Sequence, residues 1–215
     1  KLRARVNMSF IPKKLYINAE IQRVHKLAVN GIRLSPCVNV QRWSTADYTG
    51  EITALLHEGE NLIEIEGCTE DIARMNRPPF VFLSGNFVLD EKNTIITPSE
   101  AIEAVGWDKA GYPYYCGVGV YKTNTVVDTA FKKATLTVNT KDVAEIYVNG
   151  EYAGTKLWMP DETDITSLLR AGENEIEVRI TSTFANLFAC QWYEELSEPR
   201  TENGVLEPMV IHLYR

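Results

Sequence analysis

Five side chains are candidates for binding sugars, because of their types and their places in two loops. Tyr152 and Trp158 follow an Asn-Gly turn signal, and Trp43 shares a loop with Gln41 and Asp47. A flat aromatic ring packs on the apolar face of a pyranose, and polar side chains beside it can hydrogen-bond the hydroxyl groups. We therefore predict carbohydrate contacts at these residues. For Trp158 we favour a structural ring, buried in a core or between domains, over a binding one, because aromatic side chains bury large areas, and for Trp43 we expect exposure.

The segment "MPDETD" (159–164) is rich in oxygen ligands. Calcium prefers carboxylates together with loop carbonyls, so Asp161, Glu162 and Asp164 are candidate ligands of a structural calcium ion. The spacing is not that of an EF-hand. Asp164 also precedes a short helical turn, where a carboxylate accepts backbone N–H bonds as a cap. Both interpretations stay open, and no other cofactor is predicted.

Paired carboxylates are the usual machinery of glycoside hydrolysis, in which two carboxyl groups flank the scissile bond. Glu173, Glu175 and Glu177 alternate along one expected strand, which is typical of a solvated strand face. The chain contains no nucleophile elbow, phosphate loop or HExxH motif, and its three histidines are isolated in the sequence. We therefore predict no catalytic residues in this chain.

Composition limits the partners. The 215 residues carry a formal net charge of −7, which disfavours nucleic acids and anionic membranes as partners, because both attract basic surfaces.

The chain opens in strand-like alternation without an initiator methionine, so we expect a piece of a longer protein. The cysteines are far apart, in no zinc-binding spacing, and we interpret them as buried free thiols. Unpaired thiols favour the bacterial cytoplasm over a secreted or cell-surface location. These cysteines are Cys37, Cys68, Cys116 and Cys190.

The chain repeats itself. "EITALLHEGENLIEIEG" (51–67) and "DITSLLRAGENEIEVRI" (164–180) are identical at nine of seventeen aligned positions. The segments 13–31 and 132–150 also align without a gap, so that Gly31 matches Gly150. A period of more than 100 residues is too long for a solenoid repeat and predicts two tandem domains of one fold.

The elements of the repeat are strands. Both copies alternate apolar and polar residues with period two and contain an Asn-Gly turn, which is typical of a β-hairpin. We predict an all-β protein of two tandem antiparallel jelly-roll β-sandwiches. The first, with the linker, would occupy 1–103 and lack its own beginning, and the second would occupy 104–215. The only helix expected between the copies is 99–107.

The second half resembles a known family. Residues 143–188 are similar to the galactose-binding-like jelly roll known as the family 2 glycoside hydrolase sugar-binding domain, and more closely to the C-terminal jelly roll of family 106 α-L-rhamnosidase-like proteins. Three departures stand out: Cys116 and Glu207 replace small residues, and the loop 159–163 is acidic where the family has proline and aromatics. The resemblance rests on "GYPYYCG" (111–117), Asn149-Gly150, Trp158 with Pro160, Asp164-Ile165-Thr166, Gly172-Glu173-Asn174, Asn186 and "NGVLEPMVI" (203–211).

The resemblance implies a non-catalytic accessory module from the C-terminal part of a larger glycoside hydrolase acting on plant or host glycans. Its partners would be the catalytic domain of the same polypeptide and an oligo- or polysaccharide. The first alternative is a free-standing glycan-binding or adhesion module. The second is a hydrolase with carboxylates placed between the two sandwiches.

Overall fold

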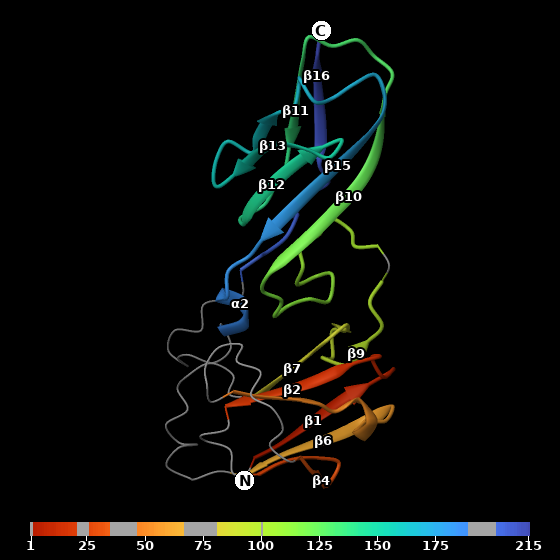
Figure 1. The fold of residues 1–215 in the computed structure, drawn as a ribbon, viewed down its shortest axis with the longest axis vertical. Helices are drawn as coiled ribbons and strands as arrows, with labels where there is room; N and C mark the ends of the chain where they lie inside the picture. Colours follow the sequence, from red (N-terminus) through yellow and green to blue (C-terminus); the bar gives the residue numbers. More distant parts are fainter. Residues whose placement is uncertain (1, 21–25, 35–46, 67–80, 100, 189–200) are drawn as a thin grey trace. The chain divides into compact units, whose positions relative to one another are not determined.

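The computed structural model describes residues 2–20, 26–34, 47–66, 81–99, 101–188 and 201–215. The described residues fall into two compact units (Figure 1). The first contains the residues up to Ser99 together with Phe188, and the second contains the others from Ala101 onward. Within these ranges no helix is both long and apolar enough to cross a membrane.

The second unit consists of two antiparallel sheets. A four-stranded sheet has the order β10-β15-β12-β13, and a three-stranded sheet has the order β14-β11-β16. The strands are β10 (Val118–Val127), β11 (Lys133–Thr137), β12 (Val143–Val148), β13 (Glu151–Lys156), β14 (Glu162–Asp164), β15 (Gly172–Thr181) and β16 (Val210–Tyr214). A short helix, α2 (Ala185–Phe188), follows β15.

The first unit repeats this strand order. Its larger sheet runs β4-β3-β6-β1 and continues with β9 and β8, and its smaller sheet runs β5-β2-β7. The pairs are antiparallel except for β1 with β9, which is parallel. The strands are β1 (Leu2–Met8), β2 (Leu15–Glu20), β3 (Lys26–Val29), β4 (Ile32–Arg33), β5 (Asp47–Glu51), β6 (Gly59–Glu66), β7 (Val81–Gly85), β8 (Val88–Leu89) and β9 (Ile95–Ile96).

In each unit the two sheets enclose one apolar core. In the second unit, Leu136 of β11 belongs to the same buried cluster as Ile146 of β12 and Val178 of β15. In the first unit, Ile17 of β2 clusters with Val29 of β3 and Ile63 of β6 in the same way. Alternate residues of each strand point inward, so one face of each sheet packs on this core. The chain is therefore all-β, and each unit is a β-sandwich.

The two halves correspond residue by residue, as the sequence repeat predicted. Met8 pairs with Gly59 at one end of the β1–β6 ladder, and Val127 pairs with Gly172 at the same place in the β10–β15 ladder. The two Asn-Gly turns also match, because Asn30 and Asn149 have φ values of 49° and 53°. These left-handed values are those of a type I′ hairpin turn.

The expected cap of the helical turn is present in the second unit. The Asp164 carboxylate accepts the backbone N–H of Thr166 at 2.9 Å and its hydroxyl at 2.6 Å, and these bonds hold the pKa of Asp164 below its usual range. In the first unit the equivalent turn, η1 (Thr53–Leu55), has no side-chain cap, and Glu51 only contacts the Thr53 hydroxyl at 3.3 Å.

Asp164→Ala is therefore expected to lower the melting temperature of the second unit by a few degrees, and Glu51→Ala that of the first by less, since Asp164 alone binds a backbone amide. Because folding lowers the pKa of Asp164, its stabilising effect is full at neutral pH and is lost as the pH falls through the folded-state pKa. Thermal melts at neutral and acidic pH measure both effects. Equal losses in the two variants would contradict the capping role.

Two structural expectations need correction. The helix predicted over 99–107 is wrong: the described residues from Ala101 to Trp107 form bends and turns. The backbone amides of Gly106 and Trp107 donate instead to the carbonyls of Val205 and Asn203, at 3.0 and 2.9 Å. The Trp107 side chain is buried in the second core, with its indole N–H donated to the Tyr121 hydroxyl at 2.7 Å. The interpretation of Cys116 as a buried thiol holds only in part, since the thiol is free and half-buried and its burial raises its pKa.

Candidate functional site

The outer face of the four-stranded sheet in the second unit carries a compact group of charged and aromatic side chains. Ile146, Val148 and Val178 point into the core. Because strand side chains alternate, their neighbours project from the opposite face. The outward side chains at the centre of the sheet are Lys122 on β10, Glu177 and Arg179 on β15, Tyr147 on β12, and Tyr152 and Thr155 on β13.

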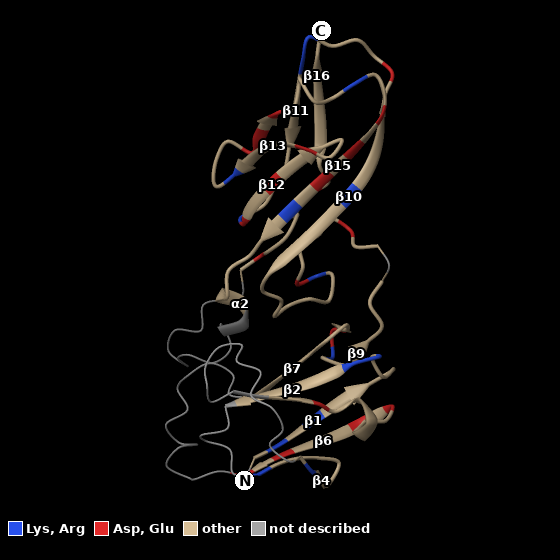
Figure 2. Ribbon diagram, viewed as in Figure 1, with Lys and Arg blue, Asp and Glu red and all other residues tan. Residues whose placement is uncertain are grey.

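A carboxylate between two cations forms the centre of this group. Glu177 accepts hydrogen bonds from Lys122 Nζ at 2.5 Å and from Arg179 Nε at 2.6 Å. The two bonds hold the pKa of Glu177 below its usual range. They cover the carboxylate, so Glu177 is buried although it lies on the outer face. The predicted solvated row of glutamates is therefore wrong at Glu177, while Glu173 and Glu175 are exposed as expected. Figure 2 shows the mixed charge along β15.

Two tyrosines extend the group toward the edge of the sheet. The Arg179 guanidinium lies 4.4 Å from the centre of the Tyr147 ring, which is a cation–π contact. The rings of Tyr147 and Tyr152 pack edge to face with their centres 5.6 Å apart, and the hydroxyl oxygens of Tyr152 and Thr155 are 2.6 Å apart. Tyr152 is thus held at both ends of its ring while 57% of the residue stays exposed. A fixed, exposed ring beside ionic groups can stack on a sugar and place hydrogen-bonding groups beside it.

The first unit shows that the tyrosines are not needed by the fold. The ion pair has a counterpart there, because Arg3 and Glu64 occupy the positions of Lys122 and Glu177 and lie 3.0 Å apart. The tyrosine positions are occupied by Ala28 and Arg33. Ala28, at the position of Tyr147, is buried, and Arg33, at the position of Tyr152, is exposed. Among the described residues, the paired tyrosines on this face therefore occur in the second unit and not at the matching positions of the first.

Trp158 lies on a separate projection. Tyr152 stands near the start of β13 and Trp158 follows its end, so the structure does not bring these two predicted residues together. Leu157, Trp158 and Met159 are exposed in succession, Trp158 at 77%. The favoured interpretation of Trp158 as a structural ring is wrong for the core of this unit, while a position between domains stays a prediction. Burial had been expected from residue type, but the β13–β14 connection turns away from the core.

A buried lysine closes the base of this projection, which we call the 157–159 tip. Lys156 Nζ donates to the Thr140 carbonyl at 2.5 Å and pairs with Asp161 Oδ1 at 2.8 Å. The ion pair joins the two residues that flank the connection, so the tip stands on a fixed base. Sequence reasoning missed Lys156, because a lysine at the end of an edge strand is typical of an exposed residue.

The three predicted calcium ligands are engaged separately. Asp161 pairs with Lys156 and Asp164 bonds to Thr166, while Glu162 is exposed on β14. Among the described residues, no group of three acidic, histidine or cysteine side chains converges in a way that could hold a metal. Two of the three carboxylates thus take part in an ion pair and a cap, and calcium binding stays a prediction.

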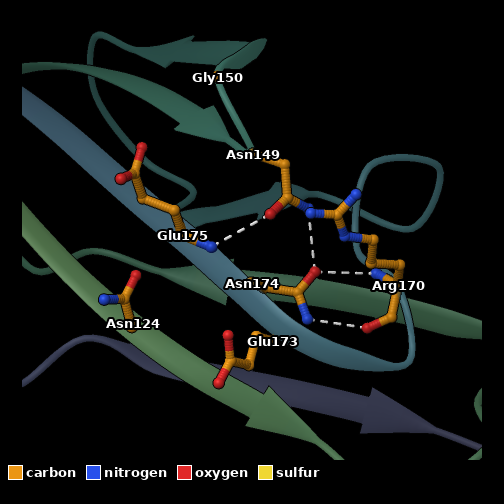
Figure 3. Close-up of a pocket in the computed structure, with 7 residues that line it drawn as sticks. All are labelled: Asn124, Asn149, Gly150, Arg170, Glu173, Asn174 and Glu175. Atoms are coloured by element: carbon orange, nitrogen blue, oxygen red, sulfur yellow. Dashed lines mark hydrogen bonds between the residues drawn. The ribbon is translucent and has the colours of Figure 1, made fainter.

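A pocket of about 360 Å³ lies at the hairpin end of the second unit (Figure 3). At its base Asn174 Oδ1 accepts from Asn149 Nδ2 and from the Arg170 amide, and its Nδ2 donates to the carbonyls of Arg170 and Gly172. All hydrogen-bonding capacity of the Asn174 amide is thereby used. Asn61 makes the same bonds with Asn30 and His57 in the first unit. The base of the pocket is a duplicated structural corner and offers no free groups of Asn174 to a ligand.

The other predicted sugar-binding residues come earlier in the chain. Gln41 and Trp43 lie outside the described residues. Asp47 begins β5, where its backbone pairs opposite Glu20. Of the residues in the candidate site, Lys122, Tyr147 and Arg179 were missed by sequence reasoning. They alternate with the core residues of their strands, and this alternation could have indicated a shared outer face.

No protein-family model and no curated protein matches the chain. Its structure is similar to that of a rhamnosidase from Novosphingobium sp. PP1Y, with 15% identity and a TM-score of 0.43, over 97% of this chain and 24% of that one. It is also similar to an α-L-rhamnosidase from Streptomyces avermitilis, with 9% identity and a TM-score of 0.33, over 83% and 21%. A lectin from Pleurotus ostreatus matches with 13% identity and a TM-score of 0.30, over 84% and 66%.

The chain thus spans about a quarter or less of the rhamnosidases that it matches. At these TM-scores the similarities carry no argument about ligand or activity.

Proposed function

We propose that the chain is a non-catalytic accessory module that binds carbohydrate through the outer face of the second sandwich. The observation that carries the proposal is the exposed Tyr152 ring, fixed by Tyr147 and Thr155 beside the Glu177–Arg179 ion pair. The ring supplies the apolar platform. The guanidinium and the nearby hydroxyls supply hydrogen-bonding groups for sugar hydroxyls. We assign the two sandwiches to galactose-binding-like jelly rolls of a larger glycoside hydrolase of the family 106 type.

Tyr152→Ala is expected to weaken glycan binding at least tenfold. Wild-type binding should be on the order of 0.1–1 mM, because an open aromatic platform buries little area and keeps much of its water. Tyr152→Phe keeps the ring and removes only the hydroxyl bond to Thr155, so it should lose much less. A glycan array identifies a ligand, and calorimetric titration of that ligand compares the variants.

Trp158→Ala is the matched control, since it removes another exposed aromatic ring, 77% exposed against 57% for Tyr152, from a different part of the same unit. It should leave glycan binding unchanged. Loss of binding in Trp158→Ala with retention in Tyr152→Ala would move the site to the 157–159 tip. Absence of any glycan binding at millimolar concentration would contradict the carbohydrate function.

A bracing role is the second candidate, and the 157–159 tip favours it. Contiguous exposed apolar side chains of soluble proteins are typical of protein interfaces, in which Trp and Met are enriched. The tip has apolar residues on both sides of Trp158, whereas a sugar site needs polar groups beside the ring. We infer that it contacts the catalytic domain of the same polypeptide. In the full polypeptide, Trp158→Ser should then lower the melting temperature of that domain, and an unchanged temperature would exclude this contact.

A further inference from the structure

Strand β10 presents an unpaired edge. In the four-stranded sheet it is the terminal strand, and no strand of the described residues pairs with its other side. The Ser182 amide donates to the Gly117 carbonyl at 3.0 Å, so Gly117 and every second residue after it, as far as Val127, bond toward β15. The backbone groups of the intervening residues therefore point to the open edge. These residues are Val118, Val120, Lys122, Asn124 and Val126.

Little on this edge protects it from pairing. Val118, Val120 and Val126 are each at least half exposed. Natural edge strands are usually guarded by charges, above all lysine, or by proline and bulges. The one lysine, Lys122, is bound to Glu177 across the outer face. The Tyr115 hydroxyl donates a hydrogen bond to the Val118 carbonyl at 2.9 Å, so the run of unpaired backbone groups begins at Val120.

The duplicated strand of the first unit provides the comparison. By the matched ladders, Arg3, Arg5 and Asn7 of β1 occupy the positions of Lys122, Asn124 and Val126. Both arginine side chains are largely exposed, and the β1 edge is further covered by β9 at Met8. The same fold therefore forms with a charged edge in one copy. The valines of β10 are not a requirement of the sandwich.

We propose that β10 is a self-association edge, at which two copies of this chain join their sheets as antiparallel neighbours about a two-fold axis. The edge is suited to a copy of itself. If the axis passes at Thr123, Val120 lies opposite Val126 of the second copy and Lys122 lies opposite Asn124 of the second copy. This register pairs valine with valine and keeps the two Lys122 residues from lying directly opposite each other. It forms about eight backbone hydrogen bonds between the copies.

Sedimentation velocity over a concentration series tests the proposal on this chain. Wild type is expected to show a monomer–dimer equilibrium. The double variant Val120→Lys with Val126→Lys should weaken the dimer at least tenfold, because it places like charges opposite each other. Asn7→Lys, the change at the position equivalent to Val126 in the first unit, is the matched control and should leave the dimer intact.

A charge pair tests the register. In the variant Val120→Lys with Val126→Glu, each lysine faces a glutamate of the second copy, so dimerisation should return. Amide hydrogen exchange gives an independent measure: the amides of Val120, Lys122, Asn124 and Val126 should become more protected as the wild-type concentration rises. A monomeric wild type at all concentrations, or a dimer that persists in the double-lysine variant, would overturn the proposal. So would concentration-independent exchange at these four amides.

Discussion

Asn174→Ala is expected to destabilise the second unit by roughly 3–5 kcal/mol. The Asn174 side chain is 2% exposed and joins β15, the Asn149 turn and the segment before Gly172. Alanine removes every one of these bonds and leaves the backbone N–H and C=O of Arg170 without their Asn174 partner, while the Asn149 amide keeps its bond to the Leu168 carbonyl. An unpaired buried polar group costs about 1–3 kcal/mol, and the stability of a whole domain is only about 5–15 kcal/mol. We therefore expect a second unit that unfolds under mild conditions.

Urea denaturation followed by hydrogen exchange with mass spectrometry measures the loss separately in each unit. Asn124→Ala is the matched control, because Asn124 lines the same pocket but is exposed on β10. It should change stability by no more than about 0.5 kcal/mol. Asn61→Ala should produce the large loss in the first unit instead, because Asn61 makes the equivalent bonds. A small effect of Asn174→Ala, similar to that of Asn124→Ala, would show that the corner does not stabilise the sandwich.

This corner also explains which parts of the fold could be predicted from sequence. The phrase Gly-Glu-Asn occurs in both copies because each copy needs an asparagine at the same corner and a glycine two residues earlier. Gly59 and Gly172 have φ values of 91° and 89°, in the left-handed region that favours glycine. The asparagine of each Asn-Gly turn, Asn30 or Asn149, donates to the corner asparagine of the same copy. Local residue type determines these features, so the repeat predicted them without tertiary information.

The candidate site depends on tertiary information. Lys122, Glu177, Tyr147 and Tyr152 come from four different strands and become neighbours only through the sheet order β10-β15-β12-β13. The alternation of each strand indicates which residues point outward, but not which strands are adjacent. Sequence reasoning therefore found Tyr152 as an aromatic and missed the ion pair beside it.

The predicted burial of Trp158, in the 157–159 tip, failed for a similar reason. Residue type favours burial for Trp158, and only the path of the β13–β14 connection decides its exposure. The connection begins and ends beside the Lys156–Asp161 pair, whose Nζ and Oδ1 atoms are 2.8 Å apart, so one of the predicted calcium ligands contacts an ammonium group. A carboxylate in a loop is equally suited to either cation, so the sequence left the choice open.

Gly204→Ala is the second change with a large expected effect, about 2–5 kcal/mol of lost stability in the second unit. Gly204 has φ of 86°, which an alanine adopts only at a cost of about 1–2 kcal/mol. A Cβ added there would also lie 2.5 Å from the Trp107 indole, closer than real contacts allow. The indole has little freedom to move, because its N–H is bonded to the Tyr121 hydroxyl and its ring packs edge to face on Tyr115.

Gly150→Ala separates the two contributions. Gly150 has nearly the same φ, 82°, but a Cβ added there meets nothing within 4 Å. It should therefore show the backbone cost alone, and the difference between the two variants measures the clash with Trp107. In a Trp107→Ala background the clash is absent, so Gly204→Ala should then cost about as much as Gly150→Ala. Such non-additivity is expected when two residues share one contact. Equal losses for Gly204→Ala and Gly150→Ala in the wild-type background would mean that Trp107 yields to the added methyl group. In that case the turn that holds Trp107 would be looser than its buried indole and short hydrogen bond indicate.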